Sequence, residues 1–177
     1  MGNEIEKKYL IEENGVDYTT PEFGLLYESI EQLRRDVLDK GDPIRQGYLP
    51  LVDGQGLSDL LGINVDFDPS EARLRDKSGR LFFTLKGKGG LSRRELEVEV
   101  NQDHFSQFWP KTEGRRVEKV RLDLPYQCYT LEVDVYTDRD LIVAEAEVPS
   151  IEEAHSLKAL GLDITEDSKY KNKSLAR

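Results

Sequence analysis

Alternation of apolar and polar residues dominates the chain and predicts a protein built mainly from β-strands. Side chains alternate between the two faces of a strand, so residues two apart share a face. Turn residues such as Asn14-Gly15 and Ser78-Gly79 separate these segments, and glycines at 87, 89 and 90 break another pair. The predicted strands are residues 4–11, 45–51, 71–76, 80–86, 93–101, 115–124, 128–136 and 140–148.

One amphipathic helix is expected over residues 21–40. Thr20 suits the N-cap, Pro21 suits the first helical position, and Gly41 suits the end. The apolar side chains recur at spacings of three and four, which places them on one face of the helix. These side chains are Phe23, Leu26, Tyr27, Ile30, Leu33, Val37 and Leu38.

Two shorter helices are also expected. Residues 102–109 form the first, and the capping box Ser150-Ile-Glu-Glu153 opens the second, which is expected to end near Gly161. Residues 52–70 are rich in Gly, Pro and Asp, so they are predicted to form a long loop with one helical turn.

Charged side chains occupy same-face positions in seven of the eight predicted strands. The solvent-facing side of an antiparallel sheet explains any single pair. In most pairs, however, both residues carry the same sign, and like charges on one face repel each other. The set as a whole therefore favours a ligand-binding face over an ordinary solvent-exposed one. The one-sign sets are Arg73/Arg75, Lys86/Lys88, Lys119/Arg121, Glu95/Glu97, Glu132/Asp134 and Glu145/Glu147.

A closed barrel accounts for these charges, because eight strands enclose a lumen about wide enough for side chains or one small ligand. The predicted fold class is α+β, mainly β: an eight-stranded antiparallel closed barrel, or tunnel, with a charged lumen and flanking helices. The basic strands would cradle an anion, and the acidic strands would hold Mg²⁺ or Mn²⁺. The apolar alternates would then pack under the helices, and they include Leu74, Phe83, Leu85, Leu96, Val98, Val133 and Val135.

The composition excludes several classes of partner and of protein. The net charge is -10, which argues against nucleic acid and anionic membranes as partners. One cysteine excludes an internal disulfide, and two histidines argue against a zinc protein. No apolar stretch is long enough to span a membrane, so a cytoplasmic protein is expected.

Glu4-Ile5-Glu6-Lys7-Lys8 matches the E-x-E-x-K signature of the CYTH domains, the triphosphate tunnel metalloenzymes, and the chain resembles this superfamily over almost its whole length. A single domain over residues 1–177 is therefore expected. Residues 12–45 form a helical insertion, which would cover the tunnel mouth or mediate a homodimer. Further motifs that agree in order are Gln46-Gly-Tyr-Leu49, Arg73-x-Arg75, Thr84-Leu-Lys-Gly87, Ser92-Arg-x-Glu95-x-Glu97, Glu118-Lys-x-Arg121, Glu132-Val-Asp134, Ala144-Glu-x-Glu147 and Asp167-x-x-Tyr170-Lys-Asn172.

The resemblance implies a role for each matching position. The metal ligands would be Glu4, Glu6, Glu132, Asp134, Glu145 and Glu147. The triphosphate would be bound by Lys8, Arg73, Arg75, Lys86, Lys88, Lys119, Arg121 and Lys171. Lys8, Glu95 and Glu97 would be catalytic, with the two glutamates orienting a second metal or its water.

The activity implied is hydrolysis of a small-molecule triphosphate with Mg²⁺ or Mn²⁺. Inorganic tripolyphosphate is the first expected substrate, and a nucleoside triphosphate is the next. Three alternatives stay open: a class IV-type adenylate cyclase, a thiamine triphosphatase, and a polyphosphate-binding module without catalysis. Product analysis separates them, because a hydrolase releases orthophosphate and a cyclase releases cyclic AMP.

Overall fold

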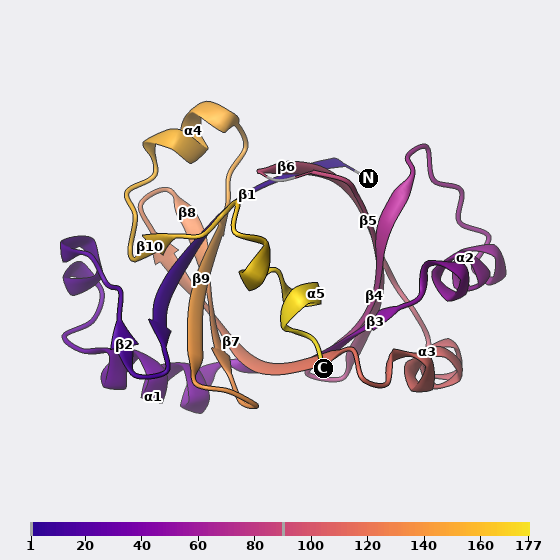
Figure 1. Cartoon of the computed structure of the whole chain (residues 1–177), viewed down its shortest axis with the longest axis horizontal. Helices are drawn as coiled ribbons and strands as arrows, with labels where there is room; N and C mark the ends of the chain where they lie inside the picture. The colour runs from indigo at the N-terminus through magenta and orange to yellow at the C-terminus, as the bar shows by residue number, and fades with distance from the viewer. Residues whose placement is uncertain (1, 90) are drawn as a thin grey trace. The chain divides into compact units, whose positions relative to one another are not determined.

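The structure, a computed structural model, describes residues 2–89 and 91–177 (Figure 1). All eight predicted strands are present, while residue 90 of the predicted glycine break lies outside the described residues. Two short strands were not predicted, β2 (Val16–Asp17) and β10 (Leu162–Asp163), and both pair with β1. The long strands are β1 (Gly2–Glu13), β3 (Asp42–Leu49), β4 (Pro69–Lys77), β5 (Arg80–Gly87), β6 (Ser92–Glu99), β7 (Arg116–Tyr126), β8 (Tyr129–Tyr136) and β9 (Leu141–Glu147).

Hydrogen bonding joins the strands in the order β10-β1-β6-β5-β4-β3-β7-β8-β9, and β1 also pairs with β9. The order of the long strands is therefore cyclic, which confirms the predicted class of a mainly β protein with a closed antiparallel barrel. The chain divides into two compact units. The first unit contains Ile44–Val117, Ser168–Arg177 and the residues up to Glu4, and the second contains Ile5–Pro43 and Glu118–Asp167.

The core of the first unit lies between β4–β6 and two helices, α2 (Leu51–Leu60) and α3 (Gln102–Phe108). Leu74, Phe83 and Leu85 are almost completely buried there, as the alternation predicts. Leu96 and Val98 of β6 are partly buried against the same core. This unit also contains η2 (Trp109–Thr112), η3 (Ser168–Tyr170) and α5 (Asn172–Leu175).

The prediction of a long loop after β3 was wrong, because α2 begins at Leu51 and packs against β4. Glycine is a poorer helix former than alanine by about 1 kcal/mol. Gly54 and Gly56 therefore lower the helix propensity of this segment, and the sequence does not indicate a helix. A Cβ built on Gly54 would lie 2.5 Å from the Cβ of Ala72. Gly54 therefore allows the close approach of α2 to the sheet.

The expected helix over residues 21–40 is two helices in the structure, η1 (Pro21–Leu25) and α1 (Ile30–Lys40). Ser29 caps α1 by accepting a hydrogen bond from the Gln32 N–H at 3.1 Å, and Gln32 Oε1 accepts one from the Glu28 N–H. Ser29 thus caps α1, and Gln32 binds the residue before the cap, so α1 begins at Ile30 although the apolar period starts earlier. The Thr20 hydroxyl does not cap η1, because it donates to the Ala159 carbonyl.

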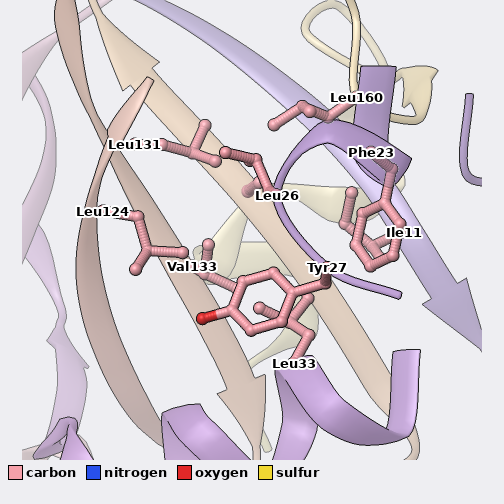
Figure 2. A pocket seen from close by; sticks show the side chains of 10 residues that line it. Ile11, Phe23, Leu26, Tyr27, Leu33, Leu124, Leu131, Val133 and Leu160 are labelled. Carbon is pink, nitrogen blue, oxygen red and sulfur yellow. The ribbon is translucent and has the colours of Figure 1, made fainter. Parts of the chain in front are cut away.

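Both helices place their apolar side chains on β7–β9 of the second unit, as the sequence predicts. Figure 2 shows the small apolar pocket that remains between them, with the Tyr27 ring beside Val133. The Tyr27 hydroxyl donates to Asp36 at 3.3 Å. The pocket is lined by Ile11, Phe23, Leu26, Tyr27, Leu33, Leu124, Leu131, Val133, Ala144 and Leu160.

Ser150 is confirmed as an N-cap, because its hydroxyl accepts a hydrogen bond from the Glu153 N–H at 3.1 Å. The helix α4 (Ile151–Ser156) nevertheless ends earlier than predicted. Gly161 lies against β1, where an added Cβ would be 2.1 Å from the Leu10 carbonyl oxygen. The close packing of the following segment against β1 therefore explains why this glycine lies outside a helix.

Candidate functional site

In the first unit, β4, β5 and β6 arrange charged residues in rows across the sheet. Arg73 pairs with Thr84, and Thr84 pairs with Glu97. In the next row Lys86 lies between its cross-strand partners Glu71 and Glu95. We call the residues of these rows, together with Glu4, Arg75 and Arg93, the first charged cluster.

Glu97 joins the two arginines of β4. Its carboxylate accepts hydrogen bonds from Arg75 at 2.9 and 3.0 Å, from Arg73 at 3.3 Å and from the Thr84 hydroxyl at 2.8 Å. Burial raises the pKa of Glu97, but the charge of Arg75 and the bond from Thr84 outweigh burial and lower this pKa. Glu97 is therefore a carboxylate that holds the guanidinium groups in place.

Lys86 lies between two carboxylates. Its ammonium is 2.9 Å from Glu4 and 2.6 Å from Glu95, and Arg93 also donates to Glu4 at 3.2 Å. Burial raises the pKa of Glu4, yet Lys86 and a hydrogen bond with Glu95 bring it to about 2. Burial and the Glu4 charge raise the pKa of Glu95. The two carboxyls thus differ in basicity although they share one lysine.

The sequence pattern gave no role to Glu71, Thr84 and Arg93 of this cluster, nor to Gln46 and Tyr48 of β3, the cross-strand partners of Arg75 and Arg73. Tyr48 is buried, and its hydroxyl accepts a hydrogen bond from Gln46 Nε2 at 2.8 Å. Burial and then the Glu71 charge raise the pKa of Tyr48. Gln46 and Tyr48 lie two apart on β3, so the same-face rule could have found them had neutral polar residues been included.

One donor in this cluster stands out. Arg73 is 6% exposed, and its Nε atom is buried without a hydrogen-bond partner among the residues that the structure describes. Buried polar groups are nearly always satisfied, so such a donor requires an explanation. An anionic ligand at Arg73 would satisfy it.

In the second unit, β1, β9, β8 and β7 form a second set of rows. Lys8 pairs with Glu145, Glu145 pairs with Glu132, and Arg121 pairs with Asp134 in the next row. The second charged cluster is defined here as Lys8, Lys119, Arg121, Glu132, Asp134 and Glu145. Each of these residues was a predicted site residue, so the second unit brings them together as expected.

Asp134 is completely buried and accepts hydrogen bonds from both Lys119 and Arg121. Burial raises its pKa, but the charges of Arg121 and Lys119 lower it below the ordinary value. Burial also lowers the pKa of Lys119 to about 8, because Asp134 compensates only part of the lost hydration. Asp134, and to a lesser extent Glu145, therefore favour the charged form of this buried lysine.

Glu145 connects Lys8 to Arg121. Its carboxylate is 2.7 Å from the Lys8 ammonium and 3.1 Å from Arg121 Nη2. Burial raises the pKa of Glu145, but Lys8 and Arg121 lower it well below the ordinary value. Burial raises the pKa of Glu132, and its ion pair with Arg121 does not fully offset this effect. Glu132 is thus the more readily protonated of the two carboxyls.

Carboxylates of β1, β8 and β9 are the candidate metal ligands of the second unit. Glu6 and Glu147 are cross-strand partners, a like-charge arrangement that a hard divalent cation relieves. The oxygen donors therefore suit Mg²⁺ or Mn²⁺ in kind. Within residues 2–89 and 91–177, however, no three Asp, Glu, His or Cys side chains form a ready metal site. Lys8 and Arg121 engage these oxygens, so metal binding requires some ion pairs to open.

Two predicted triphosphate-binding residues lie outside these clusters. Lys88 follows the end of β5 and is exposed. Lys171 is half-buried at the N-cap of α5. Both remain predictions from the sequence.

Comparisons with known proteins show which proteins the chain is similar to. An inorganic triphosphatase of Nitrosomonas europaea is 38% identical over 141 residues, which is 76% of this chain and 83% of that protein. A crystal structure of an inorganic triphosphatase matches with a TM-score of 0.56 and 29% identity, over 99% of this chain and 95% of that one. An adenylate cyclase candidate from Bacillus halodurans matches with a TM-score of 0.53 over 89% and 87% of the two chains, but at 19% identity only the fold is shared. No family model matches the chain.

The closed antiparallel barrel and the 38% identity to an inorganic triphosphatase together define the triphosphate tunnel class. The chain belongs to this class, the CYTH superfamily, and it is related to the inorganic triphosphatases. Members of this family generally depend on a metal.

The helices between residues 2 and 177, residue 90 set aside, are all too short or too polar to cross a membrane.

Proposed function

We propose that this chain is a metal-dependent triphosphatase whose first substrate is inorganic tripolyphosphate. Water would attack a terminal phosphorus, the bridging P–O bond would break, and orthophosphate and pyrophosphate would leave. The kinship to inorganic triphosphatases supports this proposal. The buried Arg73 Nε carries it, because this donor lacks an acceptor among the described residues and phosphoryl oxygens are suitable acceptors.

The basic residues would bind the substrate in this proposal. Charge spreads over the non-bridging oxygens during phosphoryl transfer, and fixed cations stabilise that charge. Arg73 and Arg75 are already held by Glu97, so their guanidinium groups are arranged before the substrate arrives. The proposed contacts are Lys8, Arg73, Arg75, Lys86, Lys88, Lys119, Arg121 and Lys171.

The proposed metal ligands are carboxylates of the second unit, with Glu4 added on the sequence motif alone. A bound Mg²⁺ or Mn²⁺ would supply Lewis-acid polarisation of the phosphoryl oxygens and a more acidic water. The protein's own contribution is a set of hard oxygen donors on adjacent strands. Those of the second unit are Glu6, Glu132, Asp134, Glu145 and Glu147.

Glu95, Glu97 and Lys8 are proposed as the catalytic residues. Glu95 would orient the attacking water and accept its proton, because burial keeps this carboxyl more basic than its neighbour Glu4. Glu97 would hold Arg73 and Arg75 until the phosphoryl oxygens replace its carboxylate at the two guanidinium groups, and it would then orient a second metal or its water. Lys8 would neutralise charge on the substrate from β1.

A phosphate-release assay tests the proposed function. Purified protein with Mg²⁺ or Mn²⁺ is expected to release orthophosphate from tripolyphosphate, with ATP and thiamine triphosphate as competing substrates. Lys8→Ala should lose most of the activity, while Lys158→Ala, which removes an exposed lysine of the same unit, should retain it. Absence of phosphate release from all three compounds would refute the proposal. Cyclic AMP formed from ATP would instead identify a cyclase.

The insertion over residues 12–45 is the proposed dimer contact, as the sequence suggests. Light scattering on the purified protein decides between monomer and dimer. A monomer at all concentrations tested would remove this role from the insertion.

A further inference from the structure

The backbone of Lys8 is held by the segment that follows β10. Its carbonyl accepts a hydrogen bond from the Ile164 N–H at 2.9 Å, and its own N–H donates to the Thr165 hydroxyl oxygen at 3.1 Å. The β10–β1 ladder itself pairs only Tyr9 with Asp163 and Leu10 with Leu162. A side-chain hydroxyl thus takes the place of the next backbone carbonyl in the ladder.

Asp163 fixes the direction of that hydroxyl. The Thr165 hydroxyl donates to Asp163 Oδ1 at 2.6 Å, and the Thr165 N–H donates to the same oxygen at 3.0 Å. A hydroxyl has one hydrogen, so donation to Asp163 leaves its lone pairs for the Lys8 N–H. The Lys7 ammonium forms an ion pair with the same carboxylate.

Lys7 and Lys8 therefore have different partners, one on each face of β1, and these partners define the register of the strand. Successive side chains point to opposite faces, so Lys7 reaches Asp163 while Lys8 reaches Glu145 in the second charged cluster. A slip of one residue would exchange the two ammonium groups between the faces. Contacts to Asp163 and Thr165 oppose that slip on the backbone and on the side chain of β1.

We propose that Asp163 and Thr165 are positioning residues that hold β1 in the register which directs the Lys8 ammonium towards the triphosphate. This inference rests on the proposed function, because it assigns a partner to a residue of that site. Neither residue would touch the substrate. Both act through Lys8.

Kinetics with Thr165→Val and Thr165→Ser test the proposal. Valine has the same shape without the hydroxyl and should lower kcat/KM for tripolyphosphate about tenfold, while serine should restore nearly the wild-type value. In a Lys8→Ala background, Thr165→Val should cost less than about twofold, because interacting residues are not additive. An equal loss in both backgrounds would show a merely structural role and overturn the proposal.

A second readout does not depend on activity. In protein labelled with ¹⁵N-lysine, the Lys8 amide should exchange with solvent about tenfold faster in Thr165→Val than in the wild type or Thr165→Ser. Thr130→Val, an exposed threonine on β8, serves as the control and should leave this rate unchanged. Unchanged protection of Lys8 in Thr165→Val overturns the proposal.

Two further outcomes separate the proposals. If the wild-type protein hydrolyses no triphosphate, the proposed function fails, and the Lys8 amide exchange still decides whether Thr165 holds β1. If Thr165→Val does not fold, Asp163→Asn provides the same test, because it removes the ion pair to Lys7 and weakens the bond that orients Thr165. Asp163→Asn should then speed Lys8 exchange, and wild-type protection in it would refute the proposal.

Discussion

The guanidinium of Arg121 binds the carboxylate of Asp134 through two parallel hydrogen bonds, from Nε to Oδ1 at 2.6 Å and from Nη2 to Oδ2 at 2.7 Å. The two residues are cross-strand partners on β7 and β8, and Asp134 has no exposed surface. Lys119 shares the same carboxylate. One buried anion therefore keeps two buried cations in place.

Asp134→Asn should destabilise the protein by about 3–5 kcal/mol, because it removes the buried carboxylate that binds both cations and leaves the buried Lys119 without its ion-pair partner. Urea unfolding measures the change. Glu118→Gln is the control, because it removes an exposed carboxylate of β7 beside Lys119, so the loss should stay below about 1 kcal/mol. Equal losses in the two variants would contradict this account of Asp134.

Glu97→Gln should strengthen the metal-free binding of tripolyphosphate about fivefold while it lowers stability. Glu97 neutralises Arg73 and Arg75, so its removal unmasks two guanidinium groups towards an anion. Isothermal titration calorimetry in EDTA measures the affinity. Glu99→Gln removes an exposed carboxylate of the same strand, β6, which pairs with Arg80 of β5, and should change the affinity little. Weaker binding by Glu97→Gln would refute this role.

Gly47→Ala should destabilise the protein by about 1–3 kcal/mol through overpacking. A Cβ at this position would lie 2.4 Å from the Thr112 hydroxyl and 2.5 Å from the Thr112 Cβ, so β3 or η2 must shift. Gly56→Ala is the control, since nothing lies within 4 Å of its Cβ and α2 should gain about 0.5–1 kcal/mol. Denaturant midpoints that move together would disprove the packing argument.

Asp163 should contribute to the acid limb of the stability curve. Burial raises its pKa, but hydrogen bonds from Lys7 and Thr165 lower the folded-state pKa below 3.8. The unfolded state therefore binds more protons in this range, so the contribution is complete above pH 3.8 and is lost as the pH falls through the folded-state pKa. Urea unfolding between pH 6 and pH 2.5 should give a shallower fall for Asp163→Asn. An identical slope would count against the lowered pKa.

Mn²⁺ or Mg²⁺ should raise the melting temperature, because a cation that binds only the folded state stabilises it by about 2.7 kcal/mol at 100 times its Kd. Glu147→Gln should reduce this rise, because Glu147 faces Glu6 across the β1–β9 pair. Glu152→Gln, an exposed carboxylate on α4, should retain the full rise. Differential scanning fluorimetry with and without EDTA checks both variants. No metal-dependent shift in the wild type would exclude a site on these strands.

The strands were predictable because alternation is a local property, and their order of charges carried the resemblance to the family. The helices were less predictable where tertiary packing decides. Gly54 weakens α2 locally, yet contact with Ala72 and burial of Leu57 stabilise the helix in the fold. Ser29 and Gln32 gave a local signal for the start of α1, but the longer apolar repeat obscured it.

Within each unit, the same-face rule brought together the residues that it selected by charge. It could not show which charges pair, because register across strands is a non-local property. Lys86 between Glu4 and Glu95, and Arg121 between Asp134 and Glu145, depend on that register. Thr165 escaped prediction for a different reason: its hydroxyl acts on a backbone N–H far away in the sequence.

The ion pairs of the second charged cluster have a consequence for selectivity. Lys8, Lys119 and Arg121 are each already matched by Glu145, Asp134 or Glu132. An incoming anion must therefore displace one of these carboxylates, so binding is an exchange of counter-ions. A singly or doubly charged ion such as sulfate gains too little from that exchange, whereas a polyvalent chain can replace several carboxylates at once. The site would thus select ligands by the number of charges that they carry, independently of their shape.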